Sequence, residues 1–366
     1  MSELISAPHS GTFYSRQKLA SIFADIGTAA LRLLPAELAH DIGMGLMKAG
    51  ALNYLPAPAV DTAMAGMKVR VPGIGDLPHP IGLAAGFDKN CKCPGAFVHM
   101  GFSMVEIGTV TPFGQTGNPK PRLFRQSEQR ALINRMGFNG DGAATVSERL
   151  KQLNWNNDRV PLGINCGKNK VTPPERAIQD YLQVIEAFKG LCRYFVVNIS
   201  SPNTPGLRDL ATPAFIEQLA DEVGHDRSKI WIKIDPDMTR REFQELVSTI
   251  ADRGFQGVII SNTHRVTFPE VGGQSGHPVM ALSTACLEWA WEVHKGRLPM
   301  IASGGVLSGI DLFQKLSRGA SAVQIYTALV YRGPWVVWKL LLELNAEMRL
   351  RGYSCVEDFI GSYYEH

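Results

Sequence analysis

Residues 300–326 read MIASGGVLSGIDLFQKLSRGASAVQIY, and this stretch shows the pattern that decides the fold. Two short apolar runs, Met300–Ser303 and Ala322–Tyr326, flank a helical stretch that opens near Ser308. Strands that alternate with helices indicate parallel βαβ units. Six earlier runs repeat the pattern: Ile81–Ala85, Met104–Val110, Val160–Asn165, Tyr194–Ile199, Ile230–Ile234 and Gly257–Ser261. Eight units in about 250 residues predict an α/β fold of the (β/α)8 TIM-barrel type.

The segments around the barrel units have different patterns. Residues Met67–Val71 and His79–Pro80 are expected to form a small hairpin that closes the barrel floor. The long stretch from Thr111 to Ala131 is dense in Pro, Gly and Arg, so we expect a loop excursion there.

The N-terminal region predicts a helical hairpin ahead of the barrel. Apolar residues recur at helical spacing over 18–34, and a second helix is expected from Pro35 to Gly50. We therefore divide the chain into an N-terminal helical extension, residues 1–65, and a barrel domain, residues 66–366. Two interpretations of the hairpin stay open. It can pack on its own barrel, or it can serve a membrane surface or a lipophilic ligand, because both helices are rich in Leu, Ile and Met.

The overall composition excludes several classes of protein. The 366 residues contain 37 Lys and Arg against 34 Asp and Glu, which gives 37 − 34 = +3 and excludes a nucleic-acid binder held by bulk charge. With 45% hydrophobic and 19% charged residues, the chain is not disordered. The six Cys have no metal-site spacing, so we expect reduced thiols and no metal. Neither a signal peptide nor a membrane-spanning helix is expected.

Polar residues and glycines follow the predicted strands, where active sites of such barrels lie. Amides, hydroxyls, lysines and glycines dominate, which suits a planar, partly anionic ligand. A glycosidase would need paired acids, and only Asp88 and Glu106 are available. Gly304 and Gly305 after the seventh run, with the glycines of 272–276, favour a phosphate held by backbone N–H groups.

Longer motifs resemble the dihydroorotate dehydrogenase family, in particular its membrane-associated, quinone-using class. The most specific is Asn-Ile-Ser-Ser-Pro-Asn-Thr-Pro-Gly-Leu-Arg at 198–208. Further matching stretches are GLAAGFDKN at 82–90, EIGTVTP at 106–112, GNPKPRLFR at 117–125, INRMGFN at 133–139, GGQSG at 272–276 and VQIY at 323–326. The stretch LPAELAHD at 34–41 resembles the helical extension of that class.

The resemblance implies an FMN enzyme of pyrimidine synthesis. Dihydroorotate would lose a proton from C5 and a hydride from C6 to give orotate, and a quinone would reoxidise the reduced FMN. Ser201 matches the base for the C5 proton, with Thr204 and Phe138 beside a water path. A serine is a weak base alone, so it needs a relay that accepts the proton.

The resemblance also implies the binding residues. Substrate contacts match Lys89, Asn134, Arg135, Met136, Gly137, Phe138, Asn198, Asn203, Asn262 and Thr263. Among these, Lys89 and the backbone of residues 135–138 are expected to hold the substrate carboxylate. FMN contacts match Ala85, Gly86, Phe87, Asp88, Lys89, Thr109, Asn165, Asn198, Lys233, Ser261, Gly276, Gly305, Tyr326 and Thr327. Quinone contacts match His40, Arg125 and Tyr326. The expected setting is a monomer, peripheral on the cytoplasmic face of a bacterial inner membrane, that binds dihydroorotate, orotate and a membrane quinone.

Two departures from the family pattern leave alternatives open. The segment between Asn262 and Gly272 is short, and His264 replaces a more usual Thr. The end of the seventh run, Ala302-Ser303-Gly-Gly, is a milder change. The alternative function is a related FMN barrel oxidoreductase acting on another pyrimidine-like or enone substrate. A non-catalytic flavin-binding or membrane-surface scaffold would predict loss of Ser201, Lys233 or the amides, and all are present.

Overall fold

The computed structural model describes residues 24–54, 66–204 and 206–365. Eight parallel strands close into a barrel in sequence order, with the last strand pairing with the first. They are β3 (Ile81–Leu83), β4 (Met104–Val110), β9 (Leu162–Cys166), β10 (Tyr194–Asn198), β11 (Ile230–Ile234), β12 (Gly257–Ile260), β15 (Met300–Ser303) and β16 (Ala322–Ile325). All eight predicted runs are thus confirmed as strands, with ends that differ by at most two residues.

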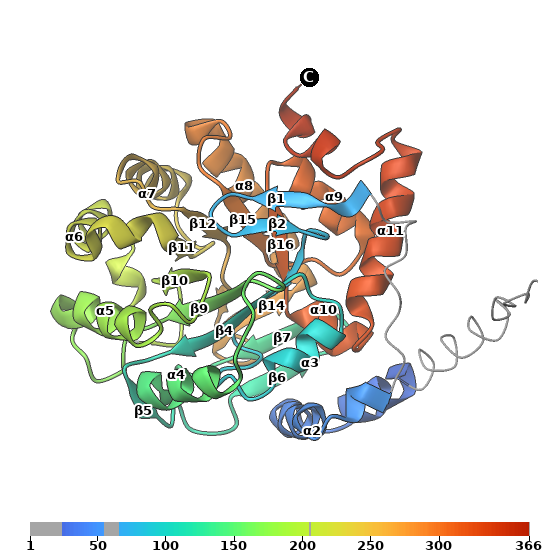
Figure 1. Cartoon of the computed structure of the whole chain (residues 1–366), viewed down its shortest axis with the longest axis horizontal. Coiled ribbons are helices and arrows are strands. Elements are labelled where there is room, and N and C mark those ends of the chain that lie inside the picture. Colours follow the sequence, from blue (N-terminus) through green and yellow to red (C-terminus); the bar gives the residue numbers. More distant parts are fainter. Residues whose placement is uncertain (1–23, 55–65, 205, 366) are drawn as a thin grey trace, which may run out of the picture.

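Helices surround the barrel as an outer ring (Figure 1). They are α3 (Pro94–His99), α4 (Ala143–Gln152), α5 (Ala177–Ala187), α6 (Pro213–Val223), α7 (Arg240–Asp252), α8 (Met280–His294), α9 (Gly309–Ser317), α10 (Thr327–Arg332) and α11 (Val336–Leu350). Ser308 and Asp311 form a capping box at the start of α9, which is where the sequence predicts that helix. Strands and helices share one apolar core that includes Trp231, Ile232 and Leu316.

Part of the N-terminal hairpin lies within the described residues. Residues 24–32 are helical, and α2 (Ala36–Lys48) follows, with Pro35 at the position before its first turn. The first part of the predicted helix, residues 18–23, lies outside the described residues, as do residues 55–65. Glu37 of α2 forms ion pairs with Arg122 (2.9 Å) and Lys120 (3.3 Å), so α2 is attached to the barrel rim. In Figure 1, α2 lies at the edge of the molecule, beyond β6 and α3.

Two predictions about local structure are wrong in part. The small hairpin pairs β1 (Val69–Val71) with β2 (Gly75–Leu77), not with residues 79–80, because the turn over 72–74 brings the chain back earlier. The 111–131 region is not only a loop. It contains β5 (Phe113–Gln115) and β6 (Leu123–Gln126), and β6 joins a sheet with β7 (Ala131–Asn134), β13 (His264–Val266) and β14 (Gly272–Gly276). Pairing with β14, far away in sequence, stabilises strands that lack apolar alternation.

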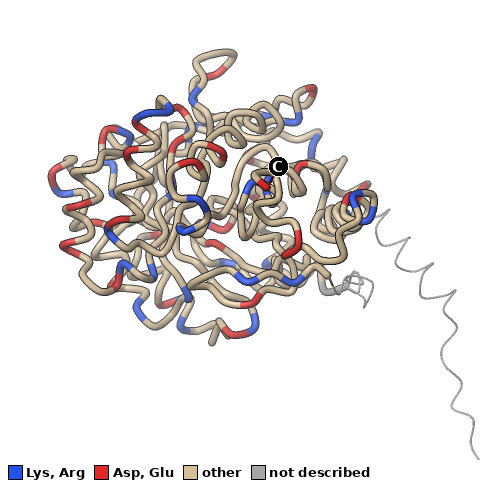
Figure 2. Tube along the Cα trace, turned by 90° about the horizontal axis from the view of Figure 1, so that it is seen from above, with Lys and Arg blue, Asp and Glu red and all other residues tan. Residues whose placement is uncertain are grey.

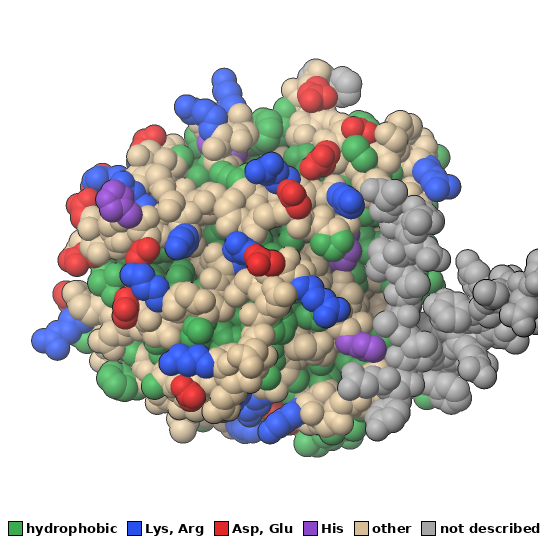
Figure 3. Space-filling model, viewed as in Figure 1, with side chains coloured by type: hydrophobic (Ala, Val, Ile, Leu, Met, Phe, Trp, Pro, Cys, Tyr) green, Lys and Arg blue, Asp and Glu red, His purple; other side chains and the backbone are tan. Residues whose placement is uncertain are grey.

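The surface carries both charges without a dominant sign. Lys and Arg alternate with Asp and Glu along the chain trace (Figure 2), and the face seen in Figure 3 shows the same mixture. This agrees with the small net charge. Within the described ranges, no helix is long and apolar enough to cross a membrane.

Candidate active site

A cavity of about 530 Å³ opens at the C-terminal ends of the barrel strands. Side chains from different strands meet there because parallel strands end at one edge: Asn198 of β10 lies beside Lys233 of β11, and Ser303 of β15 beside Gln324 of β16. Many predicted residues line it: His40, Ala85, Gly86, Phe87, Asp88, Lys89, Thr109, Asn134, Met136, Gly137, Phe138, Asn198, Ser201, Asn203, Lys233, Ser261, Asn262, Thr263, Gly276, Gly305, Tyr326 and Thr327.

The loop after β10 presents Ser201 to the cavity. Ser201 is buried, and its Oγ accepts a hydrogen bond from the Asn203 backbone N–H at 3.3 Å. This donor would stabilise negative charge on the oxygen. Among the described residues, no carboxylate or imidazole is hydrogen-bonded to Ser201. A proton taken by Ser201 must therefore pass to a water or another relay, as the sequence suggests.

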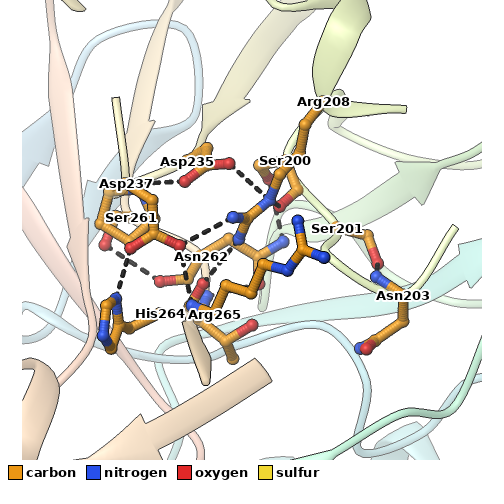
Figure 4. A network of polar contacts seen from close by, with 12 residues as sticks. Ser200, Ser201, Asn203, Arg208, Asp235, Asp237, Ser261, Asn262, His264 and Arg265 are labelled. Atoms are coloured by element: carbon orange, nitrogen blue, oxygen red, sulfur yellow. Dashed lines mark hydrogen bonds and ion pairs between the residues drawn. The ribbon is translucent and has the colours of Figure 1, made fainter. Parts of the chain in front are cut away.

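Arg208 fixes this loop to the loop after β12 (Figure 4). Its guanidinium donates to the Ser200 carbonyl (3.2 Å) and the Thr263 carbonyl (3.0 Å). On the other side it pairs with Asp235 (2.5 Å) and Asp237 (2.7 Å). Four contacts on one planar group leave little freedom to the peptide bond before Ser201. Sequence reasoning missed this role, although Arg208 closes the motif that carries the resemblance.

His264 belongs to the same network. Its Nδ1 contacts the Asp237 carboxylate, and the Arg265 backbone N–H donates to Asp237 at 2.7 Å. The short 262–272 segment thus forms the compact hairpin of β13 and β14, anchored at its base by Asp237. Phe268, near the hairpin tip, is exposed.

Four amide side chains gather at the rim, where hydrogen bonds fix their positions. Asn203 Nδ2 donates to Asn134 Oδ1 at 3.1 Å, and Asn134 Nδ2 donates to the Gly273 carbonyl at 3.2 Å. Asn262 Nδ2 donates to Ser200 Oγ at 2.9 Å, and Asn198 Nδ2 donates to Thr109 Oγ1 at 3.2 Å. Each amide offers both a donor and an acceptor, so the group can read the polar edge of a planar ring.

Positive charge lies beside these amides. Burial lowers the pKa of Lys89 to about 8, with Arg122 lowering it further and Glu37 opposing the shift. Lys89 is thus charged at neutral pH and fits a carboxylate ligand. Arg135 does not contribute its side chain to the cavity, since its Nη1 pairs with Glu270 at 2.9 Å. Only its backbone can serve a ligand, in keeping with the expectation that the 135–138 backbone does so.

Lys233 lies deeper in the cavity. Burial lowers the pKa of this lysine, and Glu106 opposes that effect. Within the described ranges its ammonium makes no hydrogen bond, which leaves a buried cation facing the cavity. Such a cation fits a cofactor ring that becomes anionic on reduction. Glu106, fully buried, accepts from Asn165 (2.8 Å) and Gln324 (2.5 Å).

The opposite end of the cavity is a cradle of glycines and hydroxyls. Gly276, Gly305 and Thr327 line it, and Ser275 Oγ and Thr327 Oγ1 are 2.8 Å apart. A side chain at Gly305 would place its Cβ 2.3 Å from Met280 Cα, and its φ of +86° also favours glycine. Exposed backbone N–H groups between small residues fit a phosphate.

A second, apolar cavity of about 310 Å³ lies between the N-terminal helices and the barrel. It contains His40, Arg125 and Tyr326, and shares His40, Phe87 and Tyr326 with the first cavity. Burial lowers the pKa of His40 to about 3, so this imidazole is neutral at physiological pH. Arg125 Nη1 donates to the Arg32 carbonyl (2.7 Å) and the Leu34 carbonyl (3.0 Å), which ties the first helix to β6.

Two predicted residues lie behind the cavity instead of lining it. Asn165 supports its wall by accepting from Thr109 Oγ1 at 2.5 Å. Thr204 is buried in the loop after Ser201 and does not line the cavity. The described residues contain no group of His, Cys, Asp and Glu able to hold a metal ion.

The fold and the site together define a TIM-barrel enzyme with a cradle of glycines and hydroxyls, an amide-lined cavity and an adjoining apolar cavity. The family model for dihydroorotate dehydrogenase matches residues 67–348. The chain therefore belongs to the dihydroorotate dehydrogenase family, whose members are flavin-dependent in general.

Individual relatives support this placement. The chain is 42% identical over 347 residues to the dihydroorotate dehydrogenase (quinone) of Myxococcus xanthus, covering 90% of this chain and 94% of the relative. It is 39% identical over 355 residues to the mitochondrial enzyme of the same name from Mus musculus, covering 91% and 88%. A ligand-free dihydroorotate dehydrogenase structure from Eimeria tenella is similar, with a TM-score of 0.82, 36% identity and coverage of 90% and 99%.

Proposed function

We propose that this protein is a quinone-dependent dihydroorotate dehydrogenase that oxidises dihydroorotate to orotate in pyrimidine synthesis. The single observation that carries the proposal is the loop after β10, which brings Ser201 to the cavity that Asn203 and Asn262 also line. Relatives at 37–42% identity with the same name support it. The compact 262–272 hairpin leaves all of these residues in place.

The chain's own residues take distinct roles in this proposal. Ser201 removes the C5 proton, while the amides of Asn134, Asn198, Asn203 and Asn262 orient the ring. Lys89 and the 135–138 backbone hold the carboxylate. A flavin bound in the cavity would supply the acceptor for the C6 hydride and the means of passing electrons on to a quinone. Lys233 stabilises negative charge at the flavin ring, and Phe138 and Thr204 are assigned to the water path beside Ser201.

The cofactor in this proposal is FMN. A cradle at Ser261, Gly276, Gly305 and Thr327 suits a terminal phosphate, and no GxGxxG strand–turn–helix unit is present to bind a dinucleotide. We expect purified protein to release one FMN per chain on heating, identified by chromatography. Release of FAD, or failure to take up any flavin on reconstitution, would contradict the proposal.

The apolar cavity that contains His40, Arg125 and Tyr326, which we call the tunnel, and the N-terminal hairpin are proposed to receive a membrane quinone. Several apolar side chains of the hairpin face solvent: Ile26, Leu33, Leu38, Ile42 and Leu46. Such a face suits a pair of helices lying on a membrane, which we place at the cytoplasmic face of a bacterial inner membrane. One chain forms both cavities, so a monomer suffices. Residues 1–65 and 66–366 remain our proposed domains.

A further inference from the structure

Lys315 of α9 is a buried cation that the proposed chemistry has not used. Its side chain is fully buried. Its Nζ donates to Ser283 Oγ (2.6 Å), Thr284 Oγ1 (2.8 Å) and the Met280 carbonyl (3.4 Å), all in the first turn of α8. These three acceptors are neutral. Among the ion pairs of the described residues, none includes Lys315.

The neighbouring charged groups are already engaged. Glu288 pairs with Arg318 at 2.6 Å, and Asp311 caps α9 by accepting from the Leu307 and Ser308 backbone N–H groups. Cys286 is the remaining titratable neighbour, and burial raises the pKa of its thiol to about 12, so it is neutral. Lys315 therefore has no compensating anion in direct contact.

This arrangement is unfavourable without a nearby anion. A buried cation without a partner loses hydration and gains no Coulomb energy. The N-terminal turn of α8 adds the positive end of a helix dipole. Burial accordingly lowers the pKa of Lys315 to about 7, with Arg318 acting in the same direction and Cys286, Asp311 and Glu288 opposing it.

The same helical turn supports the phosphate cradle. Ser283 Oγ, which accepts from Lys315, lies 3.0 Å from the Gly304 carbonyl oxygen and can donate to it. Gly305 packs against Met280 so closely that a Cβ would lie 2.6 Å from the Met280 backbone N. Lys315 thus lies directly behind the Gly304-Gly305 turn, and the cavity lies on the other side of that turn.

We propose that Lys315 is a positioning residue for the phosphate of the flavin cofactor: through Ser283 it holds the Gly304-Gly305 turn, and its ammonium supplies positive charge behind the cradle. The inference rests on the proposed FMN site. The phosphate dianion is the compensating charge that the neighbourhood of Lys315 lacks. When FMN binds, Lys315 takes up a proton that it partly loses in the flavin-free state.

Comparison of FMN with riboflavin, which has the same ring but no phosphate, tests this role. Lys315→Gln keeps a donor for Ser283 but removes the charge. One sample of the holoenzyme is exchanged into excess FMN and another into excess riboflavin. Each sample is then diluted, and the fluorescence of the released flavin gives the dissociation constant of that flavin. We expect the FMN constant to rise roughly 10- to 100-fold, as for the loss of one unit charge that acts on a phosphate dianion through the protein, and the riboflavin constant to stay within about 3-fold. Arg318→Gln is the matched control on the same helix end.

Wild-type protein provides a second test that needs no variant. If FMN binding takes up one proton on Lys315, the FMN dissociation constant should rise about tenfold per pH unit above pH 7. The phosphate itself is already a dianion there. The riboflavin constant should change little.

The possible outcomes separate the two proposals. Equal weakening of FMN and riboflavin by Lys315→Gln, or no weakening, would overturn the role of Lys315. So would a flat pH dependence of FMN binding to the wild type. If the wild type binds FMN no better than riboflavin, the proposed FMN site itself fails.

Discussion

Replacing Ser201 by alanine should slow reduction of the bound flavin by dihydroorotate by about 10²- to 10⁴-fold, the range for loss of a general base. Ser201 is the hydroxyl that the loop after β10 presents to the cavity, with the Asn203 N–H on its oxygen. Alanine keeps the backbone and the Arg208 contacts to Ser200 and Thr263. Stopped-flow absorbance under anaerobic conditions measures the rate.

Two controls separate a base from a structural residue. Ser201→Cys should recover part of the rate, because a thiolate can take the same proton. Orotate should bind to Ser201→Ala with nearly unchanged affinity, since the amides and Lys89 remain. Flavin reduction in Ser201→Ala at close to the wild-type rate would place the base elsewhere.

Replacing Arg125 by alanine should raise the KM for a long-tailed quinone by roughly 10- to 100-fold, as expected for loss of hydrogen bonds from a charged donor. Arg125 lines the apolar cavity and holds the carbonyls of Arg32 and Leu34. Without the Arg125 side chain, the first helix loses its attachment to β6. The tunnel also loses the polar group at its inner end. The KM for dihydroorotate should change less than about twofold, because the substrate amides do not contact this region.

His40→Ala should act in the same direction, since His40 lines both cavities. A small soluble dye should still reoxidise both variants at nearly the wild-type rate. Arg70→Ala is the matched control, because Arg70 is an exposed arginine of β1. Steady-state kinetics with each acceptor measures these effects. If Arg125→Ala and His40→Ala keep the wild-type quinone KM, the tunnel is not the quinone site and the hairpin is structural packing.

The barrel could be predicted because each of its strands carries its own signal. Runs such as Ile230–Ile234 are buried along their whole length, so they are rich in β-branched and other apolar residues and stand out between helical segments. The helix Ala36–Lys48 was similarly visible from its apolar spacing. These signals are local, and the closed topology follows from their number and order.

The small sheets could not be predicted in the same way. β6 and β7 are short and pair with each other, and β7 also pairs with β14, the glycine-rich stretch Gly272–Gly276, more than a hundred residues away. No alternation of apolar and polar residues marks such strands, because the backbone pairing is what stabilises them. The turn at residues 72–74 was missed for a related reason: β2 begins with Gly75-Asp76, which is typical of a loop.

In the candidate site, too, features with a local sequence signal could be predicted, and features that depend on distant residues could not. Residues within the long motifs, such as Ser201 and Asn203, were found because their neighbours in sequence carry the resemblance. Glu106 with Gln324, and Lys315 with Ser283, depend on pairing between distant elements, which a single sequence does not specify. The motif around Arg135 predicts only a backbone contact, and the side chain of Arg135 pairs with the distant Glu270 outside the cavity.

One double-mixing measurement tests the proposed function most directly. Purified wild-type protein is mixed anaerobically with dihydroorotate, then with a long-tailed quinone, while the visible absorbance of the flavin is recorded. The proposed function predicts that dihydroorotate bleaches the flavin with formation of orotate and that the quinone restores the colour. Other dihydropyrimidines should bleach the flavin far more slowly. The proposed function would be contradicted if the flavin stayed oxidised with dihydroorotate but was reduced by another dihydropyrimidine or by an enone-type substrate.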